Sequence, residues 1–435
     1  MYTVGIMKNH RVAIVGAGIA GLTAAYRILK EKTGATVDIY EAKPNIGGRI
    51  QSRIVRGQEI DFGGFLIYPW YEHAHQLFTD LEIADALVKT PLSDIIYFLD
   101  DSGIALRESE IPFPIRDGIQ IWTKSLFKIL QKSDLAAPDL ERFDGKTISE
   151  YLRSVLETQG HAGVYETFFD TVNQGYCYGP VDQSKAAFMM PIVRQMQFHG
   201  DIRTTSFFGE GAKVLTNHLE REIVALGGVV HCNTPITAIS TKALSSASET
   251  FDFDSVIFAQ NVSYPLYESL LPTIQIGCTY TAFLTIAVQL PKIPVVGNSQ
   301  NWGAAFYAPL AESSLQTLSI INLSSLYGDA LNGCVMMNIV LRDDAIHAYT
   351  ESDIARVAQE ELQRLFADIQ TVEILDSILW EQTMPIAQES FIRAVREAHG
   401  KNGIYFAGDF LGAPSIETAI ATGDIAATDV LAALE

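Results

Sequence analysis

The sequence predicts an α/β fold in which a domain with a parallel sheet is interleaved with a second, α+β domain of mixed sheet and helices. Three observations support this fold class. A strand, a glycine-rich turn, a helix and a second strand that ends on an acid follow one another over residues 12–41. Short apolar strand patterns return between residues 205 and 265 and again after residue 375. The segments between them carry helical patterns with proline breaks and longer strand patterns.

The glycine-rich turn is the most specific of these features. An apolar run, Val12–Val15, ends in Gly16-Ala17-Gly18-Ile19-Ala20-Gly21, and a helical pattern follows from Leu22. The first glycine permits a tight turn, the second lets a pyrophosphate approach the backbone, and the third lets the helix pack on the sheet. The N–H groups and the positive dipole end of that helix attract phosphate. We therefore expect a dinucleotide to contact Gly16, Gly18, Ile19, Ala20 and Gly21.

The acid that follows the second strand narrows the choice of nucleotide. The strand Val37–Tyr40 ends on Glu41, which lies 20 residues after Gly21 (41 − 21). A carboxylate at this place accepts hydrogen bonds from a ribose and repels a 2′-phosphate. The sequence therefore predicts an ADP-type nucleotide such as FAD or NAD, bound by Glu41 and its neighbour Ala42.

A second glycine loop distinguishes FAD from NAD. Residues 44–49 read Pro-Asn-Ile-Gly-Gly-Arg and end in a cation. The loop resembles the GG-R segment of the flavin amine oxidase, protoporphyrinogen oxidase and phytoene desaturase superfamily, where it lines the FAD pyrophosphate. A guanidinium beside a diphosphate is a strong charge-assisted pairing. The resemblance implies that Gly47, Gly48 and Arg49 bind FAD.

Further segments resemble motifs of the same superfamily, in the family's order. Residues 61–65 are similar to the strand end near the flavin ring, which implies contacts from Gly63, Gly64 and Phe65. Residues 208–215 resemble its helix start. Residues 228–239 resemble a strand pair whose middle apolar residue, Ile236, lies against the adenosine, and the short buried strand that follows ends at Ala259.

The C-terminal part continues the resemblance. Trp380 with Pro385 is similar to the W-x4-P element that reaches the flavin. Residues 403–409 and 415–423 resemble the C-terminal flavin motif. The motif implies that Gly408 and Asp409 meet the ribityl–phosphate region and that a helix starting at Ser415 and Ile416 points at the flavin. The sequence has a single nucleotide fingerprint, so we expect no second, NAD-binding domain.

These motifs define the expected domains. We assign residues 1–75, 205–265 and 375–435 to the FAD-binding domain, and residues 76–204 and 266–374 to a substrate domain. The substrate domain is expected to contain a helix from near Ser352 to Phe366, and residues 241–250 are expected to form a loop. Its predicted strands are Tyr280–Leu290, Trp302–Tyr307, Leu318–Leu323 and Cys334–Leu341.

Composition excludes several classes of function. An apolar content of 48% is enough for a large core, and a net charge of −20 argues against nucleic-acid binding. The four cysteines have no metal-ligand spacing, so we expect reduced thiols and no metal. The N-terminus is too short and polar for a signal peptide, and no apolar run could span a bilayer. We expect a cytoplasmic protein; residues 119–130 could attach to a membrane surface, but a helix that faces the core is favoured.

The resemblance also indicates the chemistry. Amine oxidases of the superfamily carry a lysine near flavin N5 and an aromatic residue before the C-terminal helix, whereas residues 277–290 contain no lysine and position 415 is serine. No cysteine follows Cys334, so FAD is expected to be noncovalent. Residues 143–152 and 406–417 are closer to the protoporphyrinogen oxidase and desaturase branch. The resemblance implies hydride transfer from a small or lipophilic substrate to FAD, which oxygen or another acceptor then reoxidises.

The substrate site itself is less clear from the sequence. An amine or amino-acid oxidase with an atypical cage, a flavin-dependent isomerase without net redox change and a non-enzymatic flavoprotein subunit remain as alternatives. No catalytic residue is assigned. Possible polar contacts are Asp182, Arg194, His199 and Arg203. Possible wall residues, each more simply explained as core, are Phe168, Phe169, Tyr176, Tyr178, Phe188, Met189, Met190, Met196 and Phe198.

Overall fold

The structure is a computed structural model of the whole chain. Most of the chain is described in it. The described residues are 10–31, 34–91, 94–99, 104–107, 110–111, 134–156, 162–199, 202–239, 242–262, 277–296, 299, 302–309, 315–341, 350–366 and 368–434. The apolar segment 119–130, expected to be a helix, lies outside these residues.

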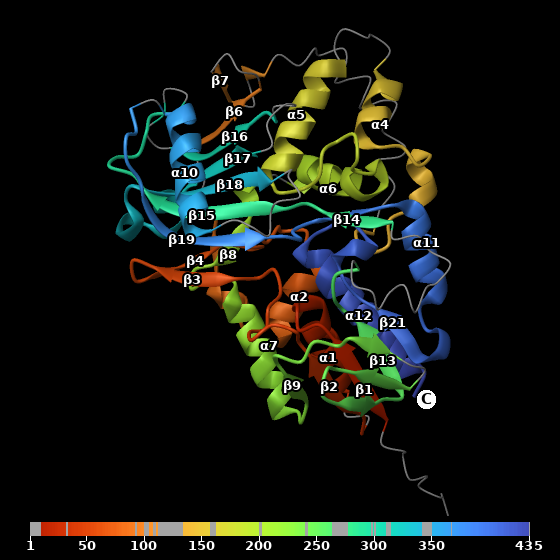
Figure 1. Cartoon of the computed structure of the whole chain (residues 1–435). Helices are drawn as coiled ribbons and strands as arrows, with labels where there is room; N and C mark the ends of the chain where they lie inside the picture. Colours follow the sequence, from red (N-terminus) through yellow and green to blue (C-terminus); the bar gives the residue numbers. More distant parts are fainter. Residues whose placement is uncertain are drawn as a thin grey trace, which may run out of the picture.

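A five-stranded parallel sheet forms the lower layer of the molecule in Figure 1. Its central strands are buried except for Arg11 at the start of β1, as expected for short apolar runs in a parallel sheet covered on both faces. Its strands come from distant parts of the chain, which confirms the predicted α/β class. In spatial order they are β21 (Ile404–Phe406), β13 (Ser255–Phe258), β1 (Arg11–Val15), β2 (Thr36–Tyr40) and β9 (Val229–His231).

Helices from both ends of the sequence pack on this sheet. Helix α1 (Ile19–Lys30) lies against α12 (Ile416–Ala432) and against α7 (Lys213–Ala225). Helix α2 (Glu72–Asp80) packs on α12. The apolar faces of these helices share one core with β1 and β2. The first and last helices of the described chain are therefore direct neighbours in this layer (Figure 1).

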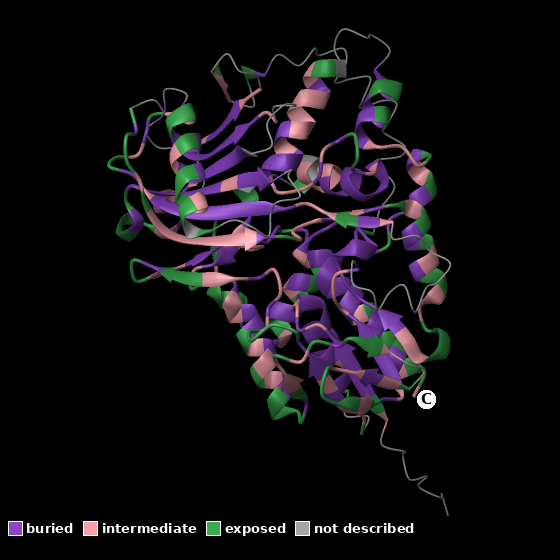
Figure 2. Ribbon diagram, in the orientation of Figure 1, coloured by how far each residue is buried: buried purple, intermediate pink, exposed green. Residues whose placement is uncertain are grey.

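A seven-stranded mixed sheet forms the upper layer, and its strands are largely buried (Figure 2). Neighbouring strands are antiparallel except for the parallel pair β16–β6. In spatial order the strands are β19 (Glu373–Trp380), β15 (Phe283–Gln289), β18 (Cys334–Leu341), β17 (Leu315–Asn322), β16 (Trp302–Tyr307), β6 (Asp94–Phe98) and β7 (Ala105–Leu106).

Helices cover both faces of the upper sheet. Helix α10 (Glu351–Leu365) shares a core with Ile96 of β6, whereas the adjacent Tyr97 packs in a different cluster beside α5 (Ala162–Gly175). Because successive side chains of a strand point to opposite faces, α10 and α5 cover opposite faces. The remaining helices in the described part are α4 (Ile148–Val155), α6 (Ala186–His199), α9 (Leu323–Tyr327) and α11 (Glu389–Ala398).

Short strands outside the two large sheets form small two- and three-stranded sheets. The small sheets pair β3 (Ser52–Val55) with β4 (Gln58–Asp61), β5 (Leu87–Lys89) with β8 (Ser206–Phe208), β14 (Cys278–Tyr280) with β20 (Pro385–Ala387), and β10 (Ala238–Ile239) with β11 (Ala243–Ser245) and β12 (Thr250–Asp252). The 3-10 helices are η1 (Ala84–Ala86), η3 (Leu140–Phe143), η4 (Ile202–Thr204), η5 (Asp329–Leu331), η7 (Lys401–Gly403) and η8 (Asp409–Leu411).

One local prediction was wrong. The small polar segment 241–250, expected to be a loop, contains β11, because Leu244 is fully buried and pairs with Phe251 across a tight turn. The helix expected from near Ser352 to Phe366 is present as α10, with Thr350 rather than Ser352 as its N-cap, because Thr350 and Asp353 form a capping box. Strand β19 also crosses the boundary predicted between residues 374 and 375 and pairs with β15 of the upper sheet. The division into domains stays a prediction.

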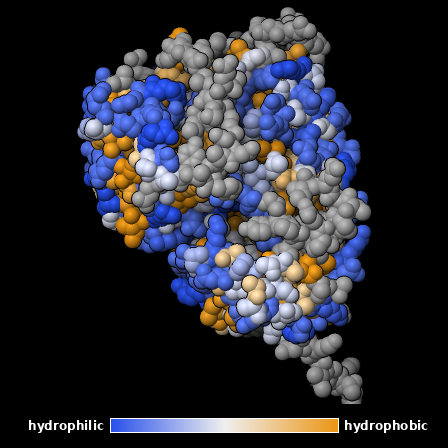
Figure 3. Space-filling view, viewed as in Figure 1, coloured by the Kyte–Doolittle hydropathy of each residue, from blue (hydrophilic) through white to orange (hydrophobic). Residues whose placement is uncertain are grey.

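Among the described residues, the exposed large apolar side chains are Ile54, Val88, Ile104, Val224, Leu226, Val229, Val295 and Ile425. The face in Figure 3 is mainly hydrophilic, with hydrophobic residues in small separate groups. No helix among the described residues is long and apolar enough to cross a bilayer. All four cysteines lie in the described part, and none of them forms a disulfide.

Candidate functional site

The glycine-rich turn brings three predicted residues into tight contact at the end of β1. Gly16 has a φ of +107°, and its N–H donates to the Tyr40 carbonyl at 2.8 Å. A Cβ at Gly16 would lie 2.6 Å from the Ala259 carbonyl oxygen, and a Cβ at Gly21 would lie 2.1 Å from the Gly16 oxygen. Only glycine fits at either place, because the backbone atoms that would clash cannot move aside.

Gly18 differs from these two glycines because it borders open space. It is the N-cap of α1, with an ordinary φ of −74°, and no heavy atom lies within 4 Å of the place of a Cβ. No side chain caps this helix end, and no acidic residue lies in its first turn. The buried Ile19 and Ala20 follow it. The N-terminus of α1 is therefore available to an anion.

The second glycine loop lies directly against this turn. The Gly47 N–H donates to the Ala17 carbonyl at 2.8 Å, and Gly18 and Gly47 form an isolated parallel bridge. Gly47 and Gly48 have φ values of +104° and +58°. A Cβ at Gly48 would lie 3.2 Å from the Gly18 Cα atom. The two loops, predicted separately from the sequence, thus form one glycine-lined surface.

Glu41 lies at the end of β2, beside the same turn. Its side chain is buried and accepts from the Ala17 N–H at 2.8 Å and from the Lys43 N–H at 2.9 Å. A carboxylate has about four lone-pair positions, so these two bonds leave acceptor capacity for hydroxyl groups. The neighbouring Ala42 is exposed. Ile236 is buried in the same cluster as Tyr40, which precedes Glu41.

Arg49 and Asp409, predicted as separate cofactor contacts, pair with each other. Nη1 and Nη2 of Arg49 donate to the two carboxylate oxygens of Asp409 at 2.8 and 2.7 Å. Nη1 also donates to the Thr383 carbonyl at 2.5 Å. Burial alone would lower the pKa of Arg49, but the Asp409 carboxylate outweighs this effect and the pKa is raised. Gly408, with a φ of +145°, precedes the acid.

The segment after β4 meets the start of α12 near this ion pair. The Gly64 N–H donates to the Arg49 carbonyl at 3.0 Å, and a Cβ at Gly63 would lie 2.0 Å from that same oxygen. A Cβ at Gly64 would lie 3.7 Å from Ile416. Ser415 is the buried N-cap of α12 and accepts from the Thr418 N–H at 3.0 Å.

Helix α2 and strand β19 contribute further buried contacts to these segments. The buried Glu417 carboxylate accepts from the His73 and Ala74 N–H groups at 2.8 and 2.9 Å, which joins α12 to the N-terminus of α2. Burial raises the pKa of Glu417. Trp380 lies at the end of β19, buried in a cluster with Phe62, which directly precedes Gly63.

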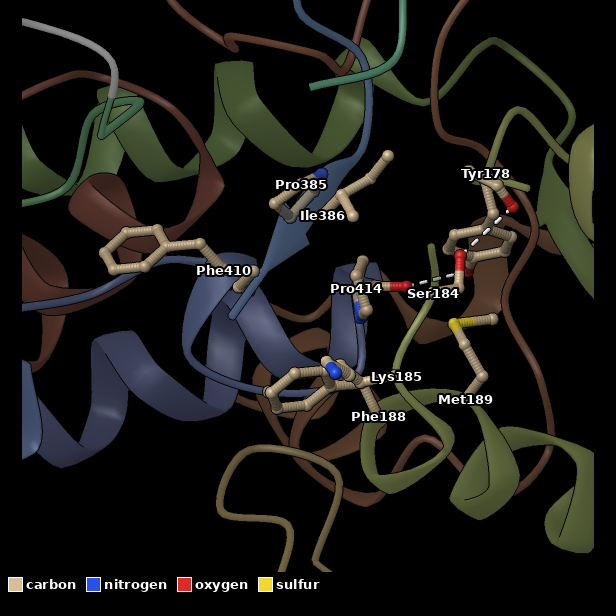
Figure 4. Close-up of a pocket in the computed structure, with 12 residues that line it drawn as sticks. Tyr178, Ser184, Lys185, Phe188, Met189, Pro385, Ile386, Phe410 and Pro414 are labelled. Carbon is tan, nitrogen blue, oxygen red and sulfur yellow. Dashed lines mark hydrogen bonds between the residues drawn. The ribbon is translucent and has the colours of Figure 1, made fainter. Parts of the chain in front are cut away.

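A small, mostly apolar pocket lies beside η8 and β20. Tyr178 donates its hydroxyl to the Pro414 carbonyl at 2.7 Å, next to Ser415 (Figure 4). Three of the predicted wall residues line the pocket, namely Tyr178, Phe188 and Met189. The other lining residues are Gly179, Ser184, Lys185, Pro385, Ile386, Ala387, Phe410, Gly412 and Pro414.

A second apolar region extends from Phe65 to the upper sheet. Phe65 and Leu66 pack in a cluster with aromatic side chains of α5, β6 and β16. Phe168 lies 5.4 Å from Tyr97 between ring centroids, and Tyr176 lies 5.2 Å from Phe306. Phe168, Tyr176 and Phe65 are only half-buried, so part of their apolar surface is accessible, and Phe65 directly follows Gly64 in the chain.

The other predicted wall and polar residues lie elsewhere. Phe169 and Met196 are half-buried beside the core of the lower layer, and Met190 is buried in a neighbouring cluster. The side chain of Phe198 is outside the described part. Asp182, His199 and Arg203 are exposed, and Arg194 is half-buried.

One residue that no sequence motif predicts connects these segments. The Thr281 hydroxyl donates to the Cys177 carbonyl at 2.8 Å and accepts from the Met384 N–H at 3.1 Å. Its carbonyl accepts from the Thr383 N–H at 2.7 Å. Cys177 has a φ of +67°, an uncommon conformation for a residue with a side chain. Thr281 thereby joins the C-terminal end of α5 to the loop that holds Arg49.

The comparison with protein families fits this geometry. Residues 19–431 match the family of flavin containing amine oxidoreductases. The chain belongs to this family. Membership places it among flavin-containing oxidoreductases and confirms the superfamily expected from the glycine loops.

Individual relatives share low sequence identity with this chain and match only part of its length. Prenylcysteine oxidase 1 of Bos taurus is 29% identical over 186 residues, which cover 37% of this chain and 36% of the relative. The polyenoic fatty acid isomerase of Ptilota filicina is 21% identical over 253 residues, covering 53% and 50%. The chain thus spans about a third to a half of the length of these curated relatives.

A solved structure shares the whole fold. The putative protoporphyrinogen oxidase from Exiguobacterium sp. 255-15 superposes with a TM-score of 0.70 at 17% identity. The superposition covers 98% of this chain and 99% of that chain. At this identity the likeness concerns the fold alone, which is the predicted one.

The residues of the site fit a dinucleotide with a flavin group. The open space at Gly18, the uncapped N-terminus of α1 and the remaining acceptor capacity of Glu41 are separate features that suit a diphosphate and a ribose. Beyond Arg49, a Cβ at Gly64 would lie 3.7 Å from Ile416 at the start of α12, and Phe65 packs with half-buried aromatic side chains. Polar features at one end and an apolar cluster at the other suit a molecule with a charged and an aromatic end.

Proposed function

We propose that the protein binds FAD noncovalently along the C-terminal edge of the parallel sheet. Three observations support the orientation: the nucleotide features lie at α1 and Glu41, the Arg49–Asp409 pair comes next, and the N-terminus of α12 lies beyond Gly64. No cysteine lies after Cys334, so a C-terminal thioether cannot form. The proposed contacts are Gly16, Gly18, Ile19, Ala20, Gly21, Glu41, Ala42, Gly47, Gly48, Arg49, Gly63, Gly64, Phe65, Ile236, Ala259, Trp380, Gly408, Asp409, Ser415 and Ile416.

We further propose that the protein oxidises a lipophilic substrate. The observation that carries this proposal is the half-buried aromatic cluster of Phe65, Phe168 and Tyr176, which begins one residue after Gly64. Apolar walls favour a poorly ionised substrate, because a charged group would lose its hydration there. Ser415 stands where amine oxidases carry an aromatic residue, which disfavours an amine.

The chain's own residues would then bind and orient the substrate and the cofactor, while the cofactor would supply the chemistry. FAD, when bound, would supply the acceptor for a hydride from the substrate, and oxygen or another acceptor would take up the electrons. The N-terminus of α12 provides N–H groups and a positive dipole end, which favour negative charge that develops nearby. Phe65 and Phe168 exclude water from the reacting end of the substrate.

The predicted domain division belongs to this proposal. The lower sheet takes its strands from residues 11–40, 229–258 and 404–406, which suits an FAD-binding domain made of three segments. The upper sheet and α5 would form the substrate domain with residues 76–204 and 266–374. Strand β19 would then be the element that the two domains share.

Gly18 offers a direct test of the cofactor site. A Gly18→Ala substitution meets no neighbouring atom and needs no unusual φ, so the protein should fold and keep its melting temperature. The added methyl group would occupy the approach of the diphosphate, so FAD content of the purified protein should fall at least about tenfold. The matched control is Gly163→Ala, an exposed helical position that also has open space. Undiminished FAD in Gly18→Ala, or no FAD in the wild type after reconstitution, would refute the site.

The substrate class is tested by reduction of the bound flavin without oxygen. Isoprenoid lipids, polyunsaturated fatty acids and primary amines would be added separately, and loss of the yellow absorbance would be recorded. We expect bleaching with a lipophilic compound and none with the amines. Bleaching by amines alone would contradict the proposal in favour of an amine oxidase.

An isomerase is the second candidate, because one relative is a polyenoic fatty acid isomerase. The same assay separates the two functions, since an isomerase would change the double-bond positions of a fatty acid without consuming oxygen or an added acceptor. Product analysis with and without oxygen decides between them.

A further inference from the structure

We propose that Asp409 is a positioning residue for Arg49, and that the pair braces the cofactor groove before the cofactor enters. This inference rests on the proposed FAD site. It changes the role expected for Asp409, from a direct contact of the ribityl–phosphate region to a group that acts through the arginine.

The geometry of the pair carries the inference. Both Asp409 oxygens accept from Arg49, at 2.8 and 2.7 Å, and the Thr383 carbonyl takes a third N–H at 2.5 Å. A guanidinium has five N–H donors in a fixed plane. Three of them are directed to residues of the described chain, and two remain for a ligand. Asp409 and Thr383 therefore fix the direction in which the remaining donors point.

Burial separates the roles of the two partners. The Asp409 side chain is 7% exposed, whereas the Arg49 side chain is 31% exposed. The carboxylate is thus the enclosed partner, and Arg49 is the partner whose side chain keeps accessible surface. Because Asp409 already neutralises Arg49, most of the charge attraction for a diphosphate would come from the N-terminus of α1.

The pair also closes the groove between distant parts of the chain. Arg49 and Asp409 are 360 positions apart in the sequence. Arg49 follows the second glycine loop, and Asp409 opens η8 between β21 and α12. Through the Thr383 carbonyl and Thr281, the same guanidinium is linked to the C-terminal end of α5. The brace therefore spans the nucleotide side and the apolar side of the proposed site.

A double-mutant cycle tests the inference. The variants are Arg49→Met, Asp409→Asn and the double variant, and FAD dissociation constants are measured by titrating the apoproteins with FAD and following quenching of its fluorescence. We expect each single change to weaken FAD about 10- to 100-fold, since each removes the same oriented charged hydrogen bonds. In the Arg49→Met background, Asp409→Asn should not change the FAD dissociation constant further, because Asp409 acts only by positioning Arg49.

Two results for FAD affinity would overturn the inference. Additive losses in the double variant would mean that Asp409 contacts FAD itself. Tighter FAD binding in Asp409→Asn would mean that the carboxylate merely repels the diphosphate. The control is the exposed pair of Arg53 and Asp376, with 2.6 Å between Nη1 and Oδ1, whose variants Arg53→Met and Asp376→Asn should leave FAD affinity unchanged.

Melting of the apoproteins tests the brace without any cofactor. Arg49→Met leaves the enclosed Asp409 carboxylate without its partner, so it should lower the melting temperature more than Asp409→Asn does. The double variant should recover part of that loss. Equal and additive shifts would overturn the brace. If Arg49→Met fails to fold, Arg49→Lys replaces it, and this variant should also weaken FAD because lysine cannot donate in the planar bidentate manner. A wild type that does not bind FAD would sink the proposed function, while the melting cycle would still decide the brace.

Discussion

The two sheet layers differ in which atoms they contribute to the proposed site, main-chain atoms in the lower layer and side chains in the upper layer. In the lower layer, the proposed cofactor groove is backbone: Gly16, Gly18 and Gly47 bring main-chain atoms to a shared surface, with Glu41 beside them. In the upper layer, the proposed substrate wall consists of ordinary side chains such as Phe168 on α5 and Tyr176 directly after it. At Gly16 and Gly47 the first arrangement tolerates almost no change in residue type, whereas the second tolerates any apolar residue of similar volume.

The difference explains why a cofactor can be retained while substrates diverge. Main-chain geometry depends on a few glycines, and a change at one of them affects the whole groove. A wall of side chains can be altered one residue at a time without loss of the fold. The predictions below test whether the two regions are as independent as this comparison implies.

The largest effect is expected from Gly21→Ala in the lower layer. The new Cβ would lie 2.1 Å from the Gly16 carbonyl oxygen and 3.2 Å from the Ala259 Cβ, so α1 would have to move off the sheet. We expect a loss of more than about 3 kcal/mol in unfolding free energy, or no soluble protein. Urea unfolding measures the loss. Gly18→Ala, three residues earlier on the same turn, should remain as stable as the wild type, and equal damage from both changes would contradict the comparison.

An intermediate, pH-dependent effect on the free energy of unfolding is expected at Asp61, which joins the β3–β4 hairpin to α7. Burial raises the pKa of Asp61 to about 6 from an ordinary 3.8, although hydrogen bonds from Ser52, Ala212 and Tyr327 act in the opposite direction. Between pH values of about 4 and 6, Asp61 of the folded protein holds a proton that Asp61 of the unfolded chain has lost. The stabilisation from this proton is therefore complete below about pH 4 and decreases as the pH rises towards about 6.

Asp61→Asn removes this titration while keeping an acceptor for the Ala212 N–H, which lies at 2.8 Å. Relative to the wild type, the variant should gain stability as the pH rises through that window, by up to about 3 kcal/mol in total. Urea unfolding of both proteins at about pH 5 and about pH 7 measures the change. Asp252→Asn, at an exposed carboxylate, serves as control, and a constant difference at both pH values for Asp61→Asn would rule out the buried proton.

The smallest effect on the fold is expected from Phe168→Ala in the upper layer. The side chain is half-buried beside Tyr97, so its removal should cost about 1–2 kcal/mol and leave FAD binding intact. Reduction of the flavin by a lipophilic substrate should slow, because the wall loses contact area. Phe98→Ala is the matched control: Phe98 is also half-buried, but it stacks on Tyr307 on the opposite face of the sheet. Equal slowing in both variants would show that α5 does not line the substrate site.

The sequence predicts well those features that depend on residues close to one another in the chain. The turn at Gly16–Gly21, strands β16 and β18 and the loop at Gly47 each follow from residue types within a few positions of one another. These patterns reflect backbone sterics and burial, which short segments encode. The fold class and the family follow from them.

The parts that the sequence does not predict depend on distant partners. The Arg49–Asp409 pair joins residues 360 positions apart, and each residue alone suggests a cofactor contact. Thr281 carries no motif, yet it holds Cys177 and Met384 by hydrogen bonds. Leu244 lies in a polar segment that suggests a loop, and only its pairing with Phe251 makes it a strand residue. Such contacts arise from tertiary packing, which overrides local preference.

The neighbouring positions of α1 and α12 have a consequence for biosynthesis. The proposed cofactor site takes the turn at Gly16–Gly21 from one part of the chain and β21, Asp409 and α12 from a part more than 350 residues later. A growing chain therefore contains the glycine turn long before the strand that pairs with β13 and the helix that packs on α1. The lower layer can complete its folding only after α12 has been made, and such non-local contacts slow folding.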